Sequence, residues 1–177
     1  NKVFEYIEAI KLFNLNKNQL SILIHPKSFI HAIIFFKGDT IKFLAHETKM
    51  TIPIMNALGL TNNKKNKNIE KKNLLNIDNF KFQIPNKKKF PFLKIIDLLP
   101  NKISYFETIL ITINDTLVDK YLNGKINYKS LQTILLNLIK KPYLKRYYKL
   151  KPNNIYDIKK MILITKKYVE YNYKNYE

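Results

Sequence analysis

Apolar residues in the first sixty positions fall into one helical pattern and several strand-like runs. Between residues 2 and 14 they recur at helical spacing, which predicts an opening helix with a stripe formed by Val3, Ile7, Ile10 and Asn14. Three short apolar runs follow at 20–26, 29–36 and 40–44, and each run predicts a strand. Pro26 is expected to end the first strand, because proline cannot donate to a sheet ladder.

The last two strand candidates flank a turn. Lys37-Gly38-Asp39 separates them, which favours a hairpin within a sheet. A short helix is expected to begin near Pro53 and to end close to Gly59. Residues 1–60 are therefore interpreted as part of a mixed α/β domain, made of helices and a short sheet.

A connector is predicted for residues 61–89. Positions 61–73 are rich in Asn and Lys and hold no apolar period, as expected of a solvated loop or a domain boundary. The rest of the connector has a few apolar anchors, namely Leu74, Leu75, Phe80 and Phe82.

From Phe90 onward the apolar spacing is helical, and 90–177 is predicted to be an α-helical domain. Pro91 and Pro100 bracket its first helix. Ser104 with Glu107 forms a capping box for the next helix, which is expected to stop at Gly124. Two further helices are expected to start at Asn127 or Ser130 and at Asn153 or Asn154. The predicted inward faces are Phe106, Leu110, Ile113, Leu117 and Tyr121; Leu131, Ile134, Leu135 and Leu138; and Ile155, Ile158, Ile162 and Val169. The predicted class is α+β, a mixed part followed by a small antiparallel helical bundle.

The chain is strongly basic, with a formal net charge of +19 and a pI of about 9.9. Taken alone, this charge favours a nucleic acid or an anionic surface as partner, and a Lys-rich nucleic-acid-binding module is the alternative interpretation. Arg146 is the only Arg, although Arg suits bidentate phosphate and base recognition best. The lysines also run along the whole chain. We interpret the charge as a general bias in residue usage and expect no nucleic-acid partner.

Nothing in the sequence indicates a membrane or disulfide-bonded protein. The longest apolar stretch, at 29–36, is interrupted by His31 and is too short to span a bilayer. The chain has no Cys and no recognisable signal peptide. We expect a cytoplasmic location, no membrane partner, and a chain that starts within a longer protein.

The first helical turn holds the best candidates for chemistry. Free N–H groups at a helix start favour an anionic group such as phosphate, and Lys2 adds a positive charge beside them. Asn1 can both donate and accept hydrogen bonds. Glu5 lies one helical step away, and its carboxylate could hold a hard cation such as Mg²⁺ or Mn²⁺. Acidic residues are also common in first turns because they suit the helix dipole, and Glu8 shares this ambiguity.

A second polar cluster runs from His25 to His31. The two His residues are six positions apart, which matches no common zinc spacing. One interpretation is a set of hydrogen bonds at a strand end, and the other is a polar edge beside an active site, where His31 could exchange protons near neutral pH. His46 has no partner in the sequence and is expected at the surface.

Several segments resemble, in order, motifs of the 1-deoxy-D-xylulose 5-phosphate reductoisomerase family. Residues 1–9 are similar to its Asn-Lys-Gly-Leu-Glu-x-Ile-Glu-Ala stretch, and 25–31 to its His-Pro-Gln-Ser-x-x-His motif. Residues 49–54 are similar to Asp-Met-Arg-x-Pro-Ile, and 90–94 to Phe-Pro-Cys-Leu-Lys. Asn114-Asp115 falls where the family has Asn-Glu. Departures are Val3 for Gly, Lys27 for Gln, Lys49 for Asp, Thr51 for Arg, and a reversed Gly38-Asp39 turn.

The resemblance implies the C-terminal part of a catalytic domain, followed by the family's helical domain. The family converts 1-deoxy-D-xylulose 5-phosphate to 2-C-methyl-D-erythritol 4-phosphate, in the non-mevalonate isoprenoid pathway, with NADPH and a divalent metal such as Mn²⁺, Mg²⁺ or Co²⁺. Carried over by position, Glu5 is the implied metal ligand and, with Lys2, catalytic. Asn1, Lys2 and Glu5 are the implied substrate-binding residues. Ser28, His31 and Met50 are expected near the site.

The resemblance also implies what lies outside this sequence. No Gly-x-Gly-x-x-Gly loop is present, so the NADPH site is expected upstream of Asn1, together with the family's other metal carboxylates. The 1–177 chain by itself is therefore expected to be inactive. A small phosphorylated sugar is the expected substrate, and a homodimer the expected assembly. A purely structural or assembly role for the strands is a further, weaker interpretation.

Overall fold

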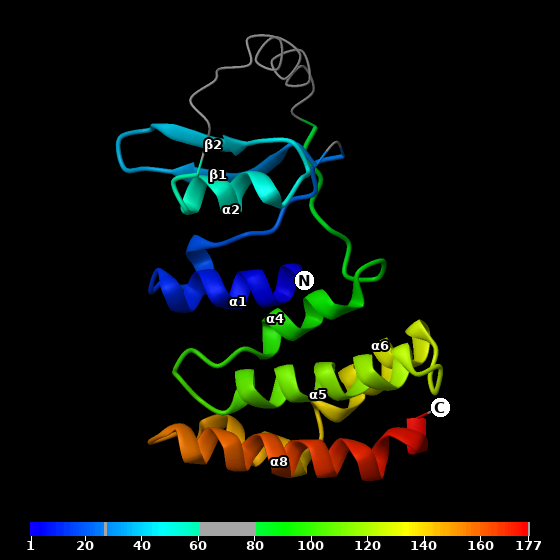
Figure 1. Cartoon of the computed structure of the whole chain (residues 1–177). Coiled ribbons are helices and arrows are strands. Elements are labelled where there is room, and N and C mark those ends of the chain that lie inside the picture. Colours follow the sequence, from blue (N-terminus) through cyan, green and yellow to red (C-terminus); the bar gives the residue numbers. More distant parts are fainter. Residues whose placement is uncertain (27, 61–80, 177) are drawn as a thin grey trace. The chain divides into compact units, whose positions relative to one another are not determined.

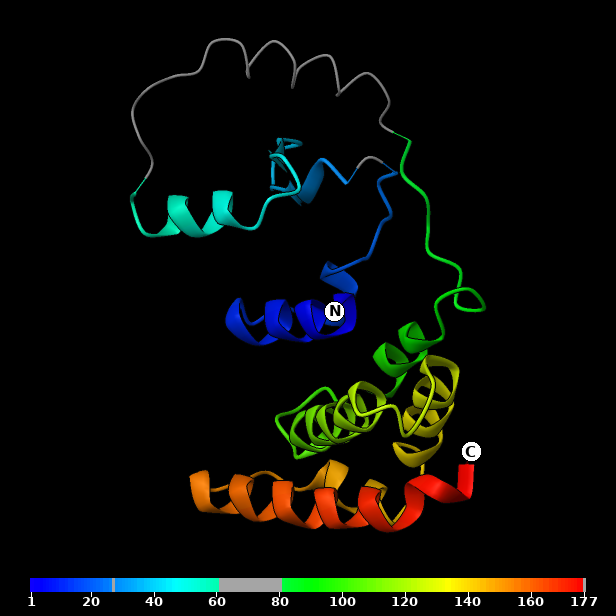
Figure 2. The same cartoon turned by 45° about the vertical axis from the view of Figure 1, so that its right-hand side comes forward.

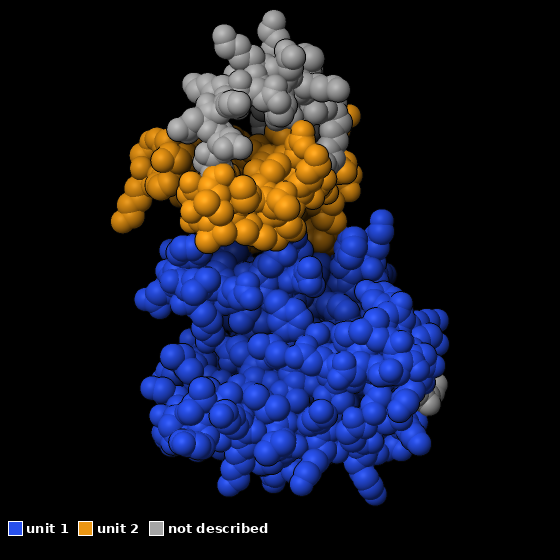
Figure 3. All heavy atoms as spheres, viewed as in Figure 1, with its two compact units in different colours: residues 1–20, 86–177 blue, residues 21–85 orange. Residues whose placement is uncertain are grey.

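The computed structural model describes residues 1–26, 28–60 and 81–176, which form two compact units (Figure 3). One unit consists of Asn1–Leu20 and Asn86–Glu177, and the other of Ser21–Pro85. The predicted α+β class is confirmed, since both helices and a small antiparallel sheet are present. The boundaries predicted at residues 60 and 89 stay a prediction. Lys27 and the connector anchors Leu74, Leu75 and Phe80 lie outside the described residues.

The first unit begins with α1 (Lys2–Leu12), as the helical spacing predicts. Val3, Tyr6 and Ile7 are buried on one side of this helix, and Ile10 is half-buried. Asn14 is exposed and does not continue the stripe, because the helix has ended at Leu12 and Asn14 adopts a positive φ of 51°. A 3-10 turn, η1 (Lys17–Gln19), follows.

The rest of this unit is a set of helices around one apolar core. They are η2 (Pro91–Leu93), α4 (Lys94–Leu98), α5 (Phe106–Leu122), α6 (Tyr128–Leu138), α7 (Pro142–Lys145), η3 (Arg146–Lys149), α8 (Ile155–Asn172) and η4 (Tyr173–Tyr176). Figures 1 and 2 show α5 lying along α8, and α6 packs against α5 and also contacts η4, which follows α8. The most completely buried large side chains are Phe106, Ile109, Leu110, Ile113, Leu117, Ile134, Leu138, Ile139, Leu144 and Val169.

Most helix ends follow their sequence signals. The Asn127 side chain accepts from the Ser130 N–H at 2.8 Å, and the Asn154 side chain accepts from the Asp157 N–H at 3.0 Å. Gly124 has a φ of +68°, the left-handed conformation that ends a helix most easily with glycine.

The predicted capping box at α5 is wrong. Ser104 Oγ accepts from the Phe106 N–H at 3.1 Å, but Glu107 does not return the bond. The helix begins at Phe106, so Glu107 occupies its second position rather than the third, which a capping box requires. This shift leaves the Glu107 carboxylate available to another helix.

The predicted inward faces hold for α6 and need correction elsewhere. Tyr121, near the end of α5, is exposed. On α8 the buried residues are Met161, Thr165 and Val169, whereas Ile155 and Ile162 are exposed and Ile158 is half-buried. The buried stripe of α8 runs at four-residue spacing and includes Thr165, which a search for apolar residues passes over because of its hydroxyl group. The three isoleucines form a second stripe, next to the buried one on the same helix.

The second unit contains a hairpin of β1 (Ile30–Phe35) and β2 (Ile41–Ala45), followed by α2 (Thr51–Ala57). The strands pair antiparallel, and the register shifts between Ile30 and Ala32, which marks a bulge at His31. No strand forms over the described part of 20–26. Ile24 makes only an isolated bridge with Gln83. A strand needs a run of paired residues, and this bridge pairs one residue with one.

Candidate functional site

The first turn of α1 brings together the three residues predicted to bind substrate. Lys2 Nζ lies 2.6 Å from Glu5 Oε2, and the two side chains are 65% and 51% exposed. Asn1 precedes the helix, and its carbonyl accepts from the Glu5 N–H at 3.0 Å. Its side chain makes no capping bond to the helix. An amide, an ammonium and a carboxylate therefore share one accessible helix end.

The apolar side of α1 packs into the first unit and so holds this helical turn in place. Val3, Tyr6 and Ile7 are buried, and the Tyr6 hydroxyl donates to the Lys17 carbonyl at 3.1 Å. Burial raises the pKa of the Tyr6 hydroxyl above its ordinary value, so it stays a neutral donor at physiological pH. Glu8, about one helical turn after Glu5, is also exposed.

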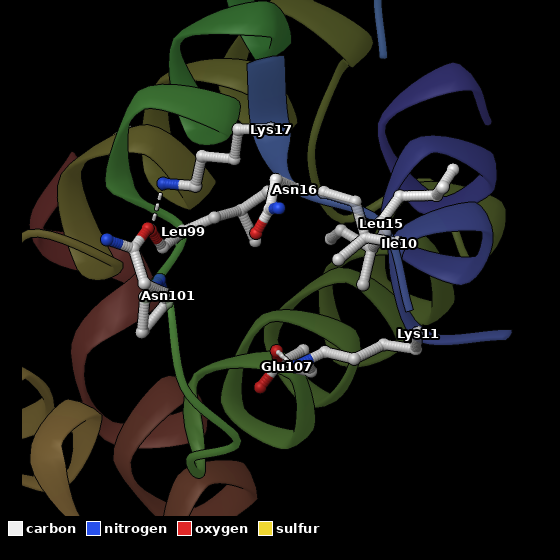
Figure 4. A pocket seen from close by; sticks show the side chains of 10 residues that line it. Ile10, Lys11, Leu15, Asn16, Lys17, Leu99, Asn101 and Glu107 are labelled. Atoms are coloured by element: carbon white, nitrogen blue, oxygen red, sulfur yellow. Dashed lines mark hydrogen bonds and ion pairs between the residues drawn. The ribbon is translucent and has the colours of Figure 1, made fainter. Parts of the chain in front are cut away.

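A pocket of about 60 Å³ lies within the first unit, beside α1 (Figure 4). It is lined by Ile7, Ile10, Lys11, Leu15, Asn16, Lys17, Leu99, Pro100, Asn101 and Glu107. Lys11 Nζ lies 2.7 Å from Glu107 Oε1, and Lys17 Nζ donates to the Leu99 carbonyl. These two contacts attach α1 and η1, respectively, to the part of this unit that follows residue 86.

Inside the second unit, His25 organises a tight turn. Its Nδ1 accepts from the N–H groups of Phe29 and Ile30 at 3.2 and 3.4 Å, so the expectation of strand-end hydrogen bonds is confirmed. The Ser28 N–H donates to the His25 carbonyl at 2.9 Å, and Ser28 adopts a φ of 51°. Ser28 is exposed at the tip of this turn, two residues before β1.

His31 lies on the bulge of β1 and has a partner that the sequence did not reveal. The rings of His31 and His46 are stacked, with centroids 3.7 Å apart and an interplanar angle of 10°. The His31 Nε2 lies 3.2 Å from the His46 carbonyl oxygen. The expectation that His46 stands alone at the surface is therefore wrong. Hairpin register places residues 31 and 46 at the same end of the ladder, and this was the signal that could have found the pair.

Met50 immediately precedes α2 and exposes most of its side chain. It is five residues after β2 ends at Ala45, so the hairpin and α2 position it together. The candidate residues thus form one group on the first unit, Asn1, Lys2 and Glu5, and another on the second unit, Ser28, His31 and Met50.

The described residues form no complete metal site. Outside residues 27, 61–80 and 177, no group of three or more His, Asp and Glu side chains converges on a common point. Glu5 supplies one accessible carboxylate, which suits a hard divalent cation as a single ligand. The three glycines of the chain are isolated at positions 38, 59 and 124, so no glycine-rich dinucleotide loop is present. No helix in the described ranges is both long and apolar enough to cross a bilayer.

These features define a mixed α+β chain in which a first helix with a polar N-terminal turn packs with a C-terminal helical group. Residues 46–168 match the family model described as the DXP reductoisomerase C-terminal domain. The chain is 44% identical over 163 residues to the 1-deoxy-D-xylulose 5-phosphate reductoisomerase of Pelagibacter ubique (strain HTCC1062), covering 91% of this chain and 41% of the relative. It is 30% identical over 140 residues to that of Elusimicrobium minutum (strain Pei191), covering 79% and 35%. The chain belongs to the 1-deoxy-D-xylulose 5-phosphate reductoisomerase family.

Solved structures agree on the fold. A crystal structure of DOX-P reductoisomerase in complex with NADPH, fosmidomycin and magnesium matches with a TM-score of 0.82 and 23% identity, over 98% of this chain and 43% of that one. The Zymomonas mobilis enzyme in complex with NADPH matches with a TM-score of 0.78 and 20% identity, over 98% and 44%. The chain therefore spans less than half the length of the relatives and structures that it matches.

Proposed function

We propose that this chain forms the C-terminal portion of an NADPH- and divalent-metal-dependent reductoisomerase that converts 1-deoxy-D-xylulose 5-phosphate to 2-C-methyl-D-erythritol 4-phosphate. The observation that supports this most strongly is the first turn of α1, where Asn1, Lys2 and Glu5 form one accessible polar group in a member of this family. The step belongs to isoprenoid biosynthesis, and the protein that performs it here is a cytoplasmic homodimer.

Lys2 and Asn1 bind the substrate's oxygens and its phosphate. Lys2 carries its charge at a helix N-terminus, where free N–H groups and the helix dipole also favour an anion. The Asn1 amide can donate to a phosphate or carbonyl oxygen and accept from a hydroxyl. The Lys2–Glu5 ion pair is exposed, so it costs little to exchange either partner for substrate or metal.

Glu5 ligates the divalent metal and lies close to the substrate hydroxyls. A bound Mg²⁺, Mn²⁺ or Co²⁺ supplies Lewis acidity for the carbon-skeleton rearrangement that precedes hydride transfer. One carboxylate cannot hold such an ion, so the remaining ligands come from outside this chain, as does the NADPH site. Ser28, His31 and Met50 line the neighbourhood of the substrate, with Met50 toward the nicotinamide or the apolar side of the sugar.

The test is the Glu5→Gln variant in a full-length protein that carries this sequence, with Glu8→Gln as the matched control. Glu8 lies on the same helix and is exposed, so both changes remove one accessible carboxylate from α1. Loss of a metal ligand should lower turnover at least about a hundredfold in Glu5→Gln and leave Glu8→Gln near wild type. Equal turnover in the two variants would show that Glu5 does not bind the metal.

Two binding measurements complete the test. Titration with Mn²⁺, followed by electron paramagnetic resonance, should show weaker binding in Glu5→Gln than in Glu8→Gln. The isolated 1–177 chain should reduce no substrate with NADPH, because Glu5 is the only metal carboxylate that we propose in it and it has no Gly-x-Gly-x-x-Gly loop. Turnover by the isolated chain would contradict the proposed division of the site.

A further inference from the structure

His46 stands out because it contacts His31 in more than one way, although neither the motifs nor the proposed chemistry uses it. Its ring stacks on that of His31 at a centroid distance of 3.7 Å. The backbone carbonyl oxygen of His46 lies 3.2 Å from His31 Nε2, and the backbone N–H of His46 donates to the Phe29 carbonyl at 3.1 Å. All of these contacts lie within the second unit, at the end of the hairpin where the register shifts.

The hydrogen-bond partners determine which ring nitrogens carry a proton. A carbonyl oxygen can only accept, so His31 Nε2 must be the donor to the His46 carbonyl. In the neutral His31 ring, Nδ1 is then the acceptor. By the same reasoning His46 Nδ1 donates to the Glu47 carbonyl at 2.6 Å, which makes Nε2 the acceptor in His46. The two stacked rings therefore carry opposite tautomers.

Three constraints act on the His31 ring at once. The bulge directs the side chain away from the regular alternation of β1. The hydrogen bond to the His46 carbonyl fixes one edge of the ring, and the His46 imidazole covers one of its faces. His31 nevertheless remains an exposed residue, so its side chain can meet a ligand.

We propose that His46 is a positioning residue, which holds His31 in the Nε2–H tautomer so that Nδ1 accepts a hydrogen bond from a hydroxyl group of the sugar phosphate substrate. His46 itself contacts His31 and not the substrate. The assignment of the substrate rests on the proposed function, whereas the tautomers and the stacking rest on the hairpin alone.

The first experiment measures the tautomers in the 1–177 chain by ¹H–¹⁵N long-range correlation spectra. The chain has only three histidines, so His25, His31 and His46 can be assigned by substituting each one. We expect the Nε2–H pattern for His31, the Nδ1–H pattern for His46, and an NOE between their rings. An Nε2–H pattern for His46, or the absence of the NOE, overturns the proposal whatever the enzyme does.

The variants separate the ring from the backbone carbonyl. His46→Phe keeps a ring for stacking, whereas His46→Ala removes it, and both keep the carbonyl that accepts from His31. His31 should retain one tautomer and its ring-current shift in His46→Phe, and lose the shift and mix tautomers in His46→Ala. Retention of both features in His46→Ala shows that stacking does not position His31.

The second experiment measures catalysis in a full-length protein that carries this sequence. His46→Ala should lower kcat/KM about tenfold, as loss of an orienting neighbour commonly does, and His46→Phe should restore most of the loss. In the His31→Phe background, His46→Ala should have no further effect, because the two residues act as one unit. Additive effects overturn the positioning role. If the unsubstituted protein has no reductoisomerase activity, the proposed function fails while the tautomer result stands.

Discussion

Lys11 on α1 and Glu107 on α5 form an ion pair of 2.7 Å between residues 96 positions apart in the chain. The Glu107 side chain is only 17% exposed, so its carboxylate depends on this partner more than a surface carboxylate would. The pair has no well-aligned hydrogen bond at Glu107 Oε1, and its contribution is mainly the attraction of the two charges. It attaches the helix that carries Glu5 to the C-terminal helices.

A double-mutant cycle should measure this attachment. Lys11→Met keeps the apolar stem and removes the charge, and Glu107→Gln keeps the shape of the side chain. We expect a coupling energy of about 1 kcal/mol in the free energy of unfolding in urea, at the upper end for partly exposed pairs. The same cycle on Lys2 and Glu5, which are both well exposed, should give less than about 0.5 kcal/mol. Equal couplings would contradict the difference in burial.

The core of the helical unit predicts unequal costs for one substitution on one helix. Leu117 is fully buried on α5, and Leu122 at the end of the same helix is 73% exposed. Leu117→Ala should lower the free energy of unfolding by about 2–5 kcal/mol, because it removes buried methyl groups and leaves a cavity. Leu122→Ala should change it by less than about 0.5 kcal/mol. Urea unfolding followed by circular dichroism checks both, and comparable losses would place the core elsewhere.

The start of α8 allows a similar comparison between adjacent asparagines. The Asn154 side chain accepts from the Asp157 N–H, whereas Asn153 contributes its backbone N–H to Asp157 Oδ2 at 3.0 Å. Asn154→Ala should therefore cost about 1 kcal/mol of stability through loss of the cap. Asn153→Ala retains its backbone bond and should be nearly neutral. The reverse order in thermal or urea unfolding would show that Asn153 is the cap.

Tyr148 should make the protein less stable in alkali. Its hydroxyl donates to the Ile139 carbonyl at 2.5 Å, and burial raises its pKa well above the ordinary value near 10. The unfolded chain therefore loses this proton before the folded chain does. The stabilisation is complete below about pH 10 and falls as the pH rises above it. Lys120 acts in the same direction, because a hydrogen bond from Lys120 to Glu170 raises the pKa of Lys120.

Tyr148→Phe separates this effect from the general response to alkali. At neutral pH the variant should be less stable than wild type by about 1 kcal/mol, because it lacks the hydrogen bond. Above pH 10 its free energy of unfolding should fall less steeply than that of wild type. Tyr171→Phe is the control, because Tyr171 is almost fully exposed. Unfolding free energies between pH 8 and 11 give the comparison. Parallel curves for wild type and Tyr148→Phe would be inconsistent with a raised pKa for Tyr148.

The large positive charge leads to a prediction about nucleic acids. If lysine usage alone creates the net charge of +19, binding to duplex DNA should be weak and should fall steeply with salt. Fluorescence anisotropy with a labelled 20-base-pair duplex should show no micromolar binding at 0.15 M salt. Micromolar affinity that persists there would favour the alternative of a nucleic-acid-binding module.

The sequence predicted those parts of the fold that depend on local pattern. The opening helix, the hairpin around Gly38 and the caps at Asn127 and Asn154 follow from spacing and turn chemistry, and the structure confirms them. The buried face of α8 differs from the predicted one because it passes through Thr165, a polar residue that hydropathy alone places at the surface. The strand expected at 20–26 depends on a partner, and a partner is not encoded within the segment itself.

In the candidate site, too, contacts between residues close in sequence could be predicted and contacts between distant residues could not. The amide, ammonium and carboxylate of the first helical turn are close in sequence, so their proximity could be predicted. His31 and His46 are fifteen positions apart, and only the register of the hairpin and its bulge bring their rings together. The pattern predicts a local cap for Glu107, but α5 starts one residue later than that capping box requires, and Glu107 pairs with Lys11 instead.

The chain passes through the first compact unit twice, because residues 1–20 and 86–177 pack together while 21–85 form the other unit. The peptide bonds in between are therefore not what keeps α1 beside α5. After a single backbone cleavage between residues 21 and 85, the two pieces should stay associated through the pocket walls and the Lys11–Glu107 contact, and should elute together until denaturant separates them.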